Sequence, residues 1–373
     1  MPGLTGSRFS NPTAPPLTPN KPPPSGNPTT ADITLASPPD DSISALAWSP
    51  VANHLAVASW DNKVRIYDVT QHTTGVGVAL FDFKGPVLDC HWTKNGAVVV
   101  GASADKTVRM LDLGGNSSAA QQVGSHDGPV KSVRFLEGIG TTPIIATGSW
   151  DKTVRYWDPR VSSTTPIATL QCPERIYGMD TRDNMLALAT AGHHIIAVNL
   201  NSPTAISIQT ESPLKHQTRC ITCFADGKTV AIGGIEGRVS IHALTNNNSD
   251  KVNNFSFKCH RDHVNSTTTE IYPINAISVH PLHGTFSTAG SDGTYHFWDR
   301  NHKHRLTHYQ PVGGSITATG YNHDGKLWAY AISYDWSKGY VSNYPQYPIK
   351  VMIHQTSEDD CQRKILGSSG LRR

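Results

Sequence analysis

Charged residues, cysteine and long apolar runs are all scarce in this sequence, and each scarcity excludes a class of protein. Charged residues make up 16% of the 373 residues and the formal net charge is +3, so any basic surface must be local. Six scattered cysteines are too few for a disulfide scaffold, which favours a reducing compartment. No apolar run reaches the ~18–20 residues of a membrane span, and the N-terminus lacks the apolar core of a signal peptide. We therefore expect a protein of the cytoplasm or nucleus.

Glycine and proline, by contrast, are abundant. The 31 glycines, 25 prolines and 37% apolar residues favour a turn-rich β protein over a helical one. Residues 1–31 are rich in proline and almost free of large apolar side chains, so they bury too little surface to offset the entropy of ordering. We expect a disordered Pro-rich tail there, with a Pro-rich ligand for a partner domain as the alternative. We also expect a flexible C-terminal tail at 356–373.

An internal repeat determines the architecture. The strongest copies are four ten-residue segments that align without gaps: SWDNKVRIYD (59–68), SADKTVRMLD (103–112), SWDKTVRYWD (149–158) and GSDGTYHFWD (290–299). Weaker copies at 190–199 and 234–243 fill the gap, and AISYDWSKGY places a seventh turn acid at Asp335. Successive copies are 41–46 residues apart, except for one step of 56 residues between Glu236 and Asp292.

The interior of each unit predicts strands. Runs of period two alternate with turns rich in Gly, Asn or Pro, which gives three or four strands in ~43 residues. This arrangement is typical of a β-propeller blade, and the signature resembles the WD40 family over residues 32–355. The predicted fold class is therefore all-β, a seven-bladed WD40 propeller. We expect the short run ITLAS (33–37) to supply the outer strand of the last blade and close the ring.

The third unit contains residue types that suggest a catalytic triad. His126, Ser149 and Asp151 occur there together with Trp157. In WD40 blades the same types resemble a structural network, in which buried polar groups satisfy one another and tie the strands together. Because geometry and not residue type defines a triad, we predict the structural role for these four residues.

A zinc site is a second candidate that we disfavour. Cys220 and Cys223 are followed by Cys259, His260 and His263. However, residues at i and i+3 of a strand point to opposite faces, so the first two thiols cannot readily bind one ion. We expect buried cysteines that pack as small apolar side chains. The sequence has no P-loop, no dinucleotide-binding glycines and no nucleophile with its base, so we expect neither a cofactor nor enzymatic activity.

Several motifs point to one branch of the WD40 family. ESPLKHQTRC (211–220), GIEGRVSIHA (234–243), FSFKCHR (255–261) and SYDWSKG (333–339) occur in this order. Together they resemble the messenger-RNA export branch, whose members act at the nuclear pore and bind the GLEBS motif of an FG nucleoporin. The related spindle-checkpoint branch binds GLEBS-like segments of checkpoint kinases and shares motifs within the first three stretches. SYDWSKG resembles the export branch and not the checkpoint branch. We therefore favour an mRNA export protein, with a checkpoint adaptor as the alternative.

The resemblance implies a partner-binding site on the fifth repeat. In the family, the GLEBS segment carries an essential acidic pair, lies across one face of the propeller and pairs with basic side chains, including the Arg of IEGR. That residue is Arg238 here, and its planar guanidinium suits bidentate binding of a carboxylate. A solvated basic edge is the alternative. The full candidate set is Arg238, Glu236, Lys215, Arg219, Lys258 and Arg261.

A second basic patch lies in the sixth repeat. Residues 300–309 contain three Lys or Arg, three His and no acid. In the family the equivalent loop helps to form a basic groove with the bound nucleoporin, which single-stranded RNA or viral mimics occupy. Aromatic side chains beside cations are typical of sequence-tolerant single-strand binding, although a core role is the alternative for two of the rings. The candidate RNA groove comprises Phe255, Phe257, Trp298, Arg300, Lys303 and Arg305.

Three tryptophans flank the turn acids, namely Trp60, Trp150 and Trp336. They either pack within the propeller or contact a partner.

We expect a nonenzymatic scaffold for nuclear export of mRNA that binds an FG nucleoporin and single-stranded RNA in messenger ribonucleoprotein. We expect it at the nuclear envelope and nuclear pore complex, shuttling to the cytoplasm, without membrane contact. Checkpoint kinases or spindle factors are the alternative partners.

Overall fold

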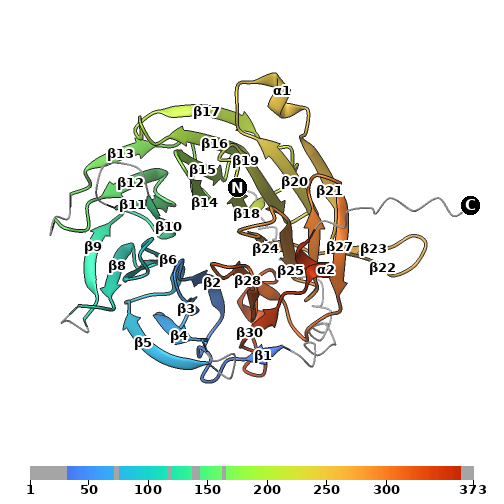
Figure 1. Cartoon of the computed structure of the whole chain (residues 1–373), viewed down its shortest axis with the longest axis horizontal. Helices are drawn as coiled ribbons and strands as arrows, with labels where there is room; N and C mark the ends of the chain where they lie inside the picture. Colours follow the sequence, from blue (N-terminus) through green and yellow to red (C-terminus); the bar gives the residue numbers. More distant parts are fainter. Residues whose placement is uncertain (1–31, 71–74, 116–118, 137–142, 162–164, 363–373) are drawn as a thin grey trace, which may run out of the picture.

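The chain folds as a ring of seven sheets. The computed structural model describes residues 32–70, 75–115, 119–136, 143–161 and 165–362, so the tail predicted at 1–31 lies outside the described residues. Seven four-stranded antiparallel sheets surround a common axis (Figure 1), which confirms the prediction of a seven-bladed propeller. No helix in the described part of the chain has the length and apolarity that a membrane span requires.

The strands follow the repeats in order. Blade 1 contains β2 (Ile43–Trp48), β3 (His54–Ser59), β4 (Lys63–Asp68) and β5 (Val76–Asp82). Blade 2 contains β6 (Val87–Trp92), β7 (Val98–Ser103), β8 (Thr107–Asp112) and β9 (Gln121–Ser125). Blade 3 contains β10 (Val130–Leu136), β11 (Ile144–Ser149), β12 (Thr153–Trp157) and β13 (Ala168–Gln171). Blade 4 contains β14 (Ile176–Arg182), β15 (Met185–Thr190), β16 (His194–Asn199) and β17 (Ile206–Glu211).

The remaining blades complete the circle. Blade 5 contains β18 (Thr218–Cys223), β19 (Thr229–Gly234), β20 (Arg238–Ala243) and β21 (Phe255–Lys258). Blade 6 contains β24 (Ile274–Val279), β25 (Phe286–Gly290), β26 (Tyr295–Asp299) and β27 (His304–Tyr309). Blade 7 contains β28 (Ile316–Tyr321), β29 (Leu327–Ile332), β30 (Lys350–Gln355) and β1 (Ile33–Thr34).

Each blade has two ends, which define the two faces of the ring. We call the end with the turn between the second and third strands, and with the link to the next blade, the upper face. The lower face carries the connections from the first to the second strand and from the third to the fourth. In blade 5, the turn 235–237 is on the upper face and the loops 224–228 and 244–254 are on the lower face.

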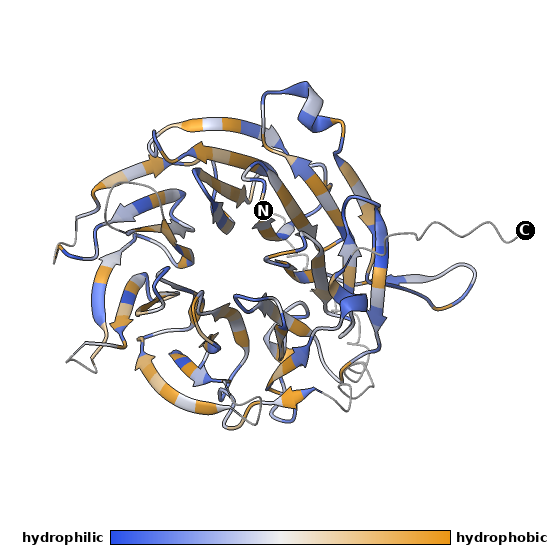
Figure 2. Ribbon diagram, viewed as in Figure 1, coloured by the Kyte–Doolittle hydropathy of each residue, from blue (hydrophilic) through white to orange (hydrophobic). Residues whose placement is uncertain are grey.

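The hydrophobic core is divided among the blade interfaces. Within the described ranges, a buried apolar cluster lies between each pair of neighbouring blades. The second strand of each blade is buried almost throughout, so it consists mostly of apolar and small residues. Figure 2 shows apolar residues concentrated in the strands, with hydrophilic residues in many connecting loops. Removal of this apolar surface from water is the main force that holds the blades together.

The ring closes through the first strand. Ile33 and Thr34 of β1 pair antiparallel with Ile353 and Met352 of β30. This confirms that ITLAS supplies the outer strand of blade 7, although the strand is shorter than the run. Leu35 is buried in the cluster between blades 7 and 1. As a result, a single sheet contains strands from the N-terminal and C-terminal ends of the propeller.

An insertion explains the long step between the fifth and sixth turn acids. The loop on the lower face contains α1 (Asn248–Lys251). The link on the upper side contains a hairpin of β22 (Arg261–His263) and β23 (Thr269–Ile271). In Figure 1 the hairpin projects outward from the ring beyond β27.

The folded domain extends beyond residue 355, where the sequence analysis placed its C-terminal end. Residues 356–362 belong to the folded domain, and α2 (Glu358–Cys361) packs against blade 6. Asp360 is fully buried, and its carboxylate accepts hydrogen bonds from Thr307 (2.7 Å) and Tyr309 (2.9 Å). The expectation of a flexible tail is therefore wrong for 356–362, because buried polar partners hold this segment. Residues 363–373 lie outside the described residues.

A buried histidine links both ends of the propeller, and we expect the free energy of unfolding to decrease at alkaline pH because of it. His354 contacts Asp32 through Nδ1 (2.7 Å) and Asp360 through Nε2 (3.3 Å). Burial alone would lower its pKa, but the two carboxylates raise the pKa of His354 to about 9. A raised folded-state pKa gives stability that is complete below the unfolded value of about 6.5 and lost as the pH rises through about 9.

The free energy of unfolding should decrease by about 3 kcal/mol between pH 6 and about 9.5, and urea unfolding at each pH measures this change. His354→Gln is the control, because it cannot hold the proton and should flatten the change. Above about pH 9 the unfolded cysteines also ionise, so the comparison with the variant isolates the histidine. Equal pH profiles for the two proteins would refute the assignment.

Candidate partner-binding and RNA-binding surfaces

The turn of blade 5 lacks the threonine that holds the turn acid in blades 2, 3 and 6. In three blades a threonine hydroxyl two residues after the turn acid donates to that acid: Thr107 to Asp105 (2.6 Å), Thr153 to Asp151 (2.7 Å) and Thr294 to Asp292 (2.7 Å). Arg238 occupies this position in blade 5, as the first residue of β20 rather than within the turn. Its side chain has no hydrogen bond or ion pair among the described residues. Arg238 thus does not perform the role that threonine has in these three blades.

The residue before Arg238 keeps the backbone of the ordinary turn. The residue after the turn acid, or after its equivalent in blade 4, has a positive φ in all seven blades, including 70° at Lys152 and 58° at Gly237. Glycine adopts this conformation without strain. The Glu236 carboxylate accepts from the backbone N–H of Lys215 at 2.9 Å, as Asp105 does from that of Lys84 at 2.8 Å. The turn of blade 5 is therefore intact, and only its side-chain chemistry has changed.

A second cation lies directly opposite Arg238. Arg238 and Lys258 are paired residues of the β20–β21 ladder. Lys258 is exposed, and Arg238 is half-buried. Like charges directly opposite one another destabilise a sheet, and neither side chain has a carboxylate partner among the described residues. Lys215, also exposed, lies on the neighbouring link. These three cations form what we call the upper basic cluster.

The other three predicted partner-binding residues are engaged within the fold. Arg261 donates to the backbone carbonyls of Glu236 (2.7 Å) and Gly237 (3.3 Å). Arg219 donates to Asn275 Oδ1 (2.9 Å) of blade 6 and to the carbonyl of Asp335 (3.2 Å) of blade 7. The Glu236 carboxylate holds the link before blade 5. These residues shape the upper face, and their contact with a partner stays a prediction.

The aromatic residues of the predicted RNA groove form one strip between blades 5 and 6. The ring centroids of Phe255 and Phe257 are 6.0 Å apart, and those of Phe257 and Trp298 are 4.5 Å apart. All three side chains are half-buried, so each has both a packed and a solvent-facing part. Trp298 Nε1 donates to Thr288 Oγ1 at 3.0 Å. Packing and surface roles are therefore combined in these residues.

The basic residues follow the strip at its lower end and outer side. Lys303 Nζ lies 5.0 Å from the centroid of the Phe255 ring, and Arg305 pairs with Trp298 across β26 and β27. Arg300 and Lys303 line a pocket of about 390 Å³, and Phe255 is the only ring of the strip that reaches it. Phe257 and Trp298 therefore flank the groove without lining this pocket.

The two candidate surfaces occupy different ends of one strand. Lys258 ends β21 at the upper face and Phe255 begins it at the lower side. At about 3.3 Å per residue, the two positions are separated by about 10 Å along the strand. Successive side chains of a strand also point to opposite sides, so Lys258 and Phe257 face apart. The two candidate surfaces therefore consist of separate sets of side chains.

The residues predicted as a structural network lie in one hydrogen-bonded chain. His126 Nδ1 bonds Asp151 at 2.9 Å, and its Nε2 bonds Thr147 Oγ1 at 2.7 Å. Trp157 Nε1 donates to the same Thr147 hydroxyl at 2.8 Å. Ser149 Oγ accepts from the Asp151 backbone N–H at 3.1 Å, and no described contact joins it to His126. The serine–histidine pair of a hydrolase triad is therefore not formed.

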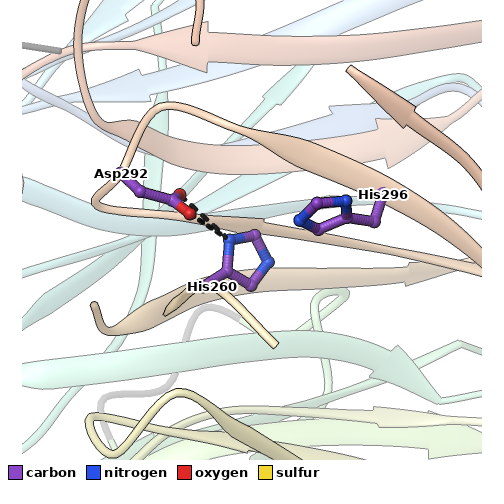
Figure 3. A group of neighbouring side chains, drawn as sticks. All are labelled: His260, Asp292 and His296. Atoms are coloured by element: carbon purple, nitrogen blue, oxygen red, sulfur yellow. Dashed lines mark hydrogen bonds and ion pairs between the residues drawn. The ribbon is translucent and has the colours of Figure 1, made fainter. Parts of the chain in front are cut away.

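Blade 6 repeats this network around His260 (Figure 3). His260 Nδ1 lies 2.9 Å from Asp292, and its Nε2 lies 2.9 Å from Thr288. His296 lies beside them, and burial lowers the pKa of His296 to about 2. The group has the residue types of a metal site, yet both nitrogens of His260 already bind protein partners. A metal ion would have to displace these hydrogen bonds.

The cysteines of the disfavoured zinc site lie on different sides of β18. Cys223 belongs to the apolar cluster between blades 4 and 5, and Cys220 packs against the cluster between blades 5 and 6. All six cysteines are unpaired. Their positions agree with the alternation expected from the i, i+3 spacing.

The tryptophans near the turns have different environments. The rings of Trp60 and Trp336 stack with centroids 4.4 Å apart and bridge blades 1 and 7. Trp150, by contrast, is 41% exposed on the upper face of blade 3. The first two therefore pack within the propeller, and Trp150 alone remains for the partner-contact alternative.

Sequence reasoning missed the partners that hold Arg300. Its guanidinium stacks over Phe224 at 4.2 Å and pairs with Asp226 at 2.9 Å. Asp226 is 74 positions away in the sequence, in the first loop of blade 5. No spacing rule within one repeat gives a signal for a contact between loops of neighbouring blades.

The seven sheets and the repeated Asp–His–Trp networks define a WD40 β-propeller. The family model described as "WD domain, G-beta repeat" matches residues 33–68, 77–112 and 119–158. The chain is 49% identical to "mRNA export factor GLE2" of Chaetomium thermophilum over 89% of this chain and 92% of the relative. It is 48% identical to "Poly(A)+ RNA export protein" of Schizosaccharomyces pombe over 88% and 92%.

A third relative, "WD40 repeat protein poxJ" of Penicillium oxalicum, is 50% identical over 90% of this chain and 97% of the relative. Identity at this level over nearly the full length shows common descent. The chain belongs to the family of WD40-repeat mRNA export factors.

Proposed function

We propose that this protein is a nonenzymatic scaffold for export of messenger RNA at the nuclear pore. It binds the GLEBS segment of an FG nucleoporin on the upper basic cluster and single-stranded RNA along the aromatic strip. The names of two relatives, an mRNA export factor and a poly(A)+ RNA export protein, support the export role. The observation that carries the proposal is the position of Arg238. It begins β20 and lies opposite Lys258 in the β20–β21 ladder.

An acidic peptide suits the upper basic cluster. Two cations held opposite each other raise the free energy of the unbound sheet, and a pair of carboxylates converts that repulsion into attraction. The guanidinium of Arg238 favours bidentate contact with one carboxylate, and the ammonium of Lys258 serves as a point charge for the other. Exposed Lys215 adds to the field that attracts an acidic segment.

The partner class is tested by direct binding of peptides. The full chain is titrated with a labelled nucleoporin GLEBS peptide and, separately, with a GLEBS-like checkpoint-kinase peptide. Preference for the nucleoporin peptide supports the export role, and localisation at the nuclear rim is the matching cellular result. Preference for the kinase peptide, with the protein at kinetochores, would replace export with the checkpoint alternative. Binding of neither peptide would remove the GLEBS proposal.

Binding of RNA to the strip should depend strongly on salt. Lys303→Glu and Arg305→Glu together should lower affinity for an oligouridylate at least about tenfold, because each removes an attraction to phosphate. The slope of log K against log salt should fall by about 0.7 for each phosphate that the protein no longer neutralises. Fluorescence anisotropy at several salt concentrations measures both quantities.

Lys350→Glu is the matched control, because it reverses an exposed charge on blade 7. Its RNA affinity should stay near that of the unchanged protein. RNA affinity that does not vary with salt, or an equal decrease in the control, would show that the strip is not an electrostatic RNA site.

A further inference from the structure

A second cavity opens on the lower face where the innermost strands of blades 1 to 4 end. Its volume is about 790 Å³, which is within the range of ligand sites. Trp48, Trp92 and Phe135 contribute its apolar floor. The two indoles are fixed to neighbouring blades, because Trp48 Nε1 donates to the carbonyl of Gly320 (3.0 Å) and Trp92 Nε1 to that of Ala47 (2.9 Å). The floor is therefore rigid and aromatic.

The rim of this cavity carries an excess of positive charge. Lys94 and Arg182 are two exposed cations, and Asp183 is the single acid among the lining residues. The Arg182 side chain has no hydrogen bond or ion pair among the described residues. Asn184 adds amide donors and acceptors at the same rim. These groups suit an anionic ligand with planar rings.

His91 supplies a further donor with a fixed tautomer. Its Nδ1 accepts the backbone N–H of Phe135 at 3.2 Å, so Nε2 carries the proton. Burial lowers the pKa of His91 to about 3, which keeps the imidazole neutral near pH 7. The ring lines the cavity and can donate one hydrogen bond there without the cost of desolvating a charge.

The cavity adjoins the RNA groove on the lower face. A Cβ added at Gly227 would lie 2.9 Å from Asp183 Oδ2, so the first loops of blades 4 and 5 touch. Asp226, the preceding residue, pairs with Arg300 at 2.9 Å and lines the groove pocket. Asp226 lines the groove pocket and Asp183 lines the cavity, so this pair of touching loops connects the two sites.

We propose that single-stranded RNA bound in the groove continues across the loops and places a nucleotide in the cavity at the ring axis. This inference rests on the proposed RNA-binding function and extends its site from blades 5 and 6 to blades 1 to 4. The base lies against the aromatic floor, and the phosphates lie near Lys94 and Arg182. The rings of the floor are only 3–9% exposed, so they shape the site for the base, and most of the attraction comes from the two cations acting on phosphate.

The carboxylates along this path differ in how strongly they repel the RNA phosphates. Asp226 is neutralised by Arg300, so the crossing between the two sites carries little net charge. Asp183 is exposed and is outnumbered by Lys94 and Arg182 at the cavity rim. The path therefore stays favourable for phosphate from one site to the other.

The length of the RNA tests the inference. The full chain is titrated with oligouridylates of about 4 and about 12 nucleotides, lengths that bracket one site and two connected sites. In Lys94→Ala/Arg182→Ala, affinity for the longer RNA should fall about tenfold and its salt slope by about 1.4, the value for two phosphate interactions. Affinity for the shorter RNA, held in the groove, should be unchanged. Photocrosslinks from 4-thiouridine in the longer RNA should map to the peptides with Trp92 and Phe135.

The control variant uses the other end of the same strand. Arg175 is exposed and directly precedes β14 at the upper face, whereas Arg182 ends that strand at the lower face. Arg175→Ala removes one charge in the same blade and should leave the binding of both RNAs unaffected. An equal decrease for both lengths, or crosslinks confined to the groove, would refute the extended path while leaving the groove as an RNA site. Absence of RNA binding at either length would instead refute the proposed function.

Discussion

Arg238→Glu is expected to lower affinity for a GLEBS peptide by more than a hundredfold, or about 3 kcal/mol. The substitution removes the guanidinium and places a carboxylate where the peptide brings its own acids. A partner then meets like charges in a partly desolvated interface, which costs more than removal of a surface ion pair. Isothermal titration calorimetry with the nucleoporin peptide measures the change.

Two further variants separate charge from fold. Lys63 occupies the position equivalent to Arg238 in blade 1, as the first residue of β4, so Lys63→Glu applies the same type of reversal elsewhere. It should bind the peptide normally. Arg238→Lys keeps the charge but removes the planar fork, so about a tenfold decrease in affinity is expected. Undiminished binding by Arg238→Glu would remove the central residue from the proposed site.

The repeats allowed the architecture to be predicted because each blade repeats the same local physics. A turn acid, a positive φ and alternating strands recur at a nearly constant spacing, so even the weak copy at 190–199 could be placed. The C-terminal boundary was missed because it depends on tertiary contacts. Asp360 is an ordinary polar residue in the sequence, and its burial follows from Thr307 and Tyr309 on another blade.

The candidate surfaces were predictable in composition but not in geometry. The motifs gave the cations near Glu236, yet nothing in them distinguishes Arg238, which has no described partner, from Arg261, which holds two backbone carbonyls. Similarly, Phe255 and Trp298 belong to one strip, but only Phe255 reaches the pocket. Such differences arise from contacts between residues far apart in the sequence, which spacing alone does not encode.

Asp151→Ala is expected to destabilise the propeller by about 3 kcal/mol. The Asp151 carboxylate accepts from buried His126 and from Thr153. Burial alone would raise the pKa of Asp151, but these hydrogen bonds hold it below its usual value. Its removal leaves a buried imidazole nitrogen without a partner, and an unsatisfied buried group costs the full desolvation penalty. Urea unfolding near pH 7 measures the difference in the free energy of unfolding.

Blade 2 provides the matched comparison, because Phe83 stands where blade 3 has His126. Asp105 accepts from the backbone N–H and hydroxyl of Thr107 and from the backbone N–H of Lys84, but from no histidine in the part of the chain that the structure describes. Asp105→Ala should therefore cost only about 1 kcal/mol, so the excess of about 2 kcal/mol in blade 3 belongs to the histidine. Equal destabilisation of the two blades would show that His126 adds nothing to stability. Loss of a hydrolytic activity with stability unchanged in Asp151→Ala would mean that this histidine and aspartate serve catalysis instead.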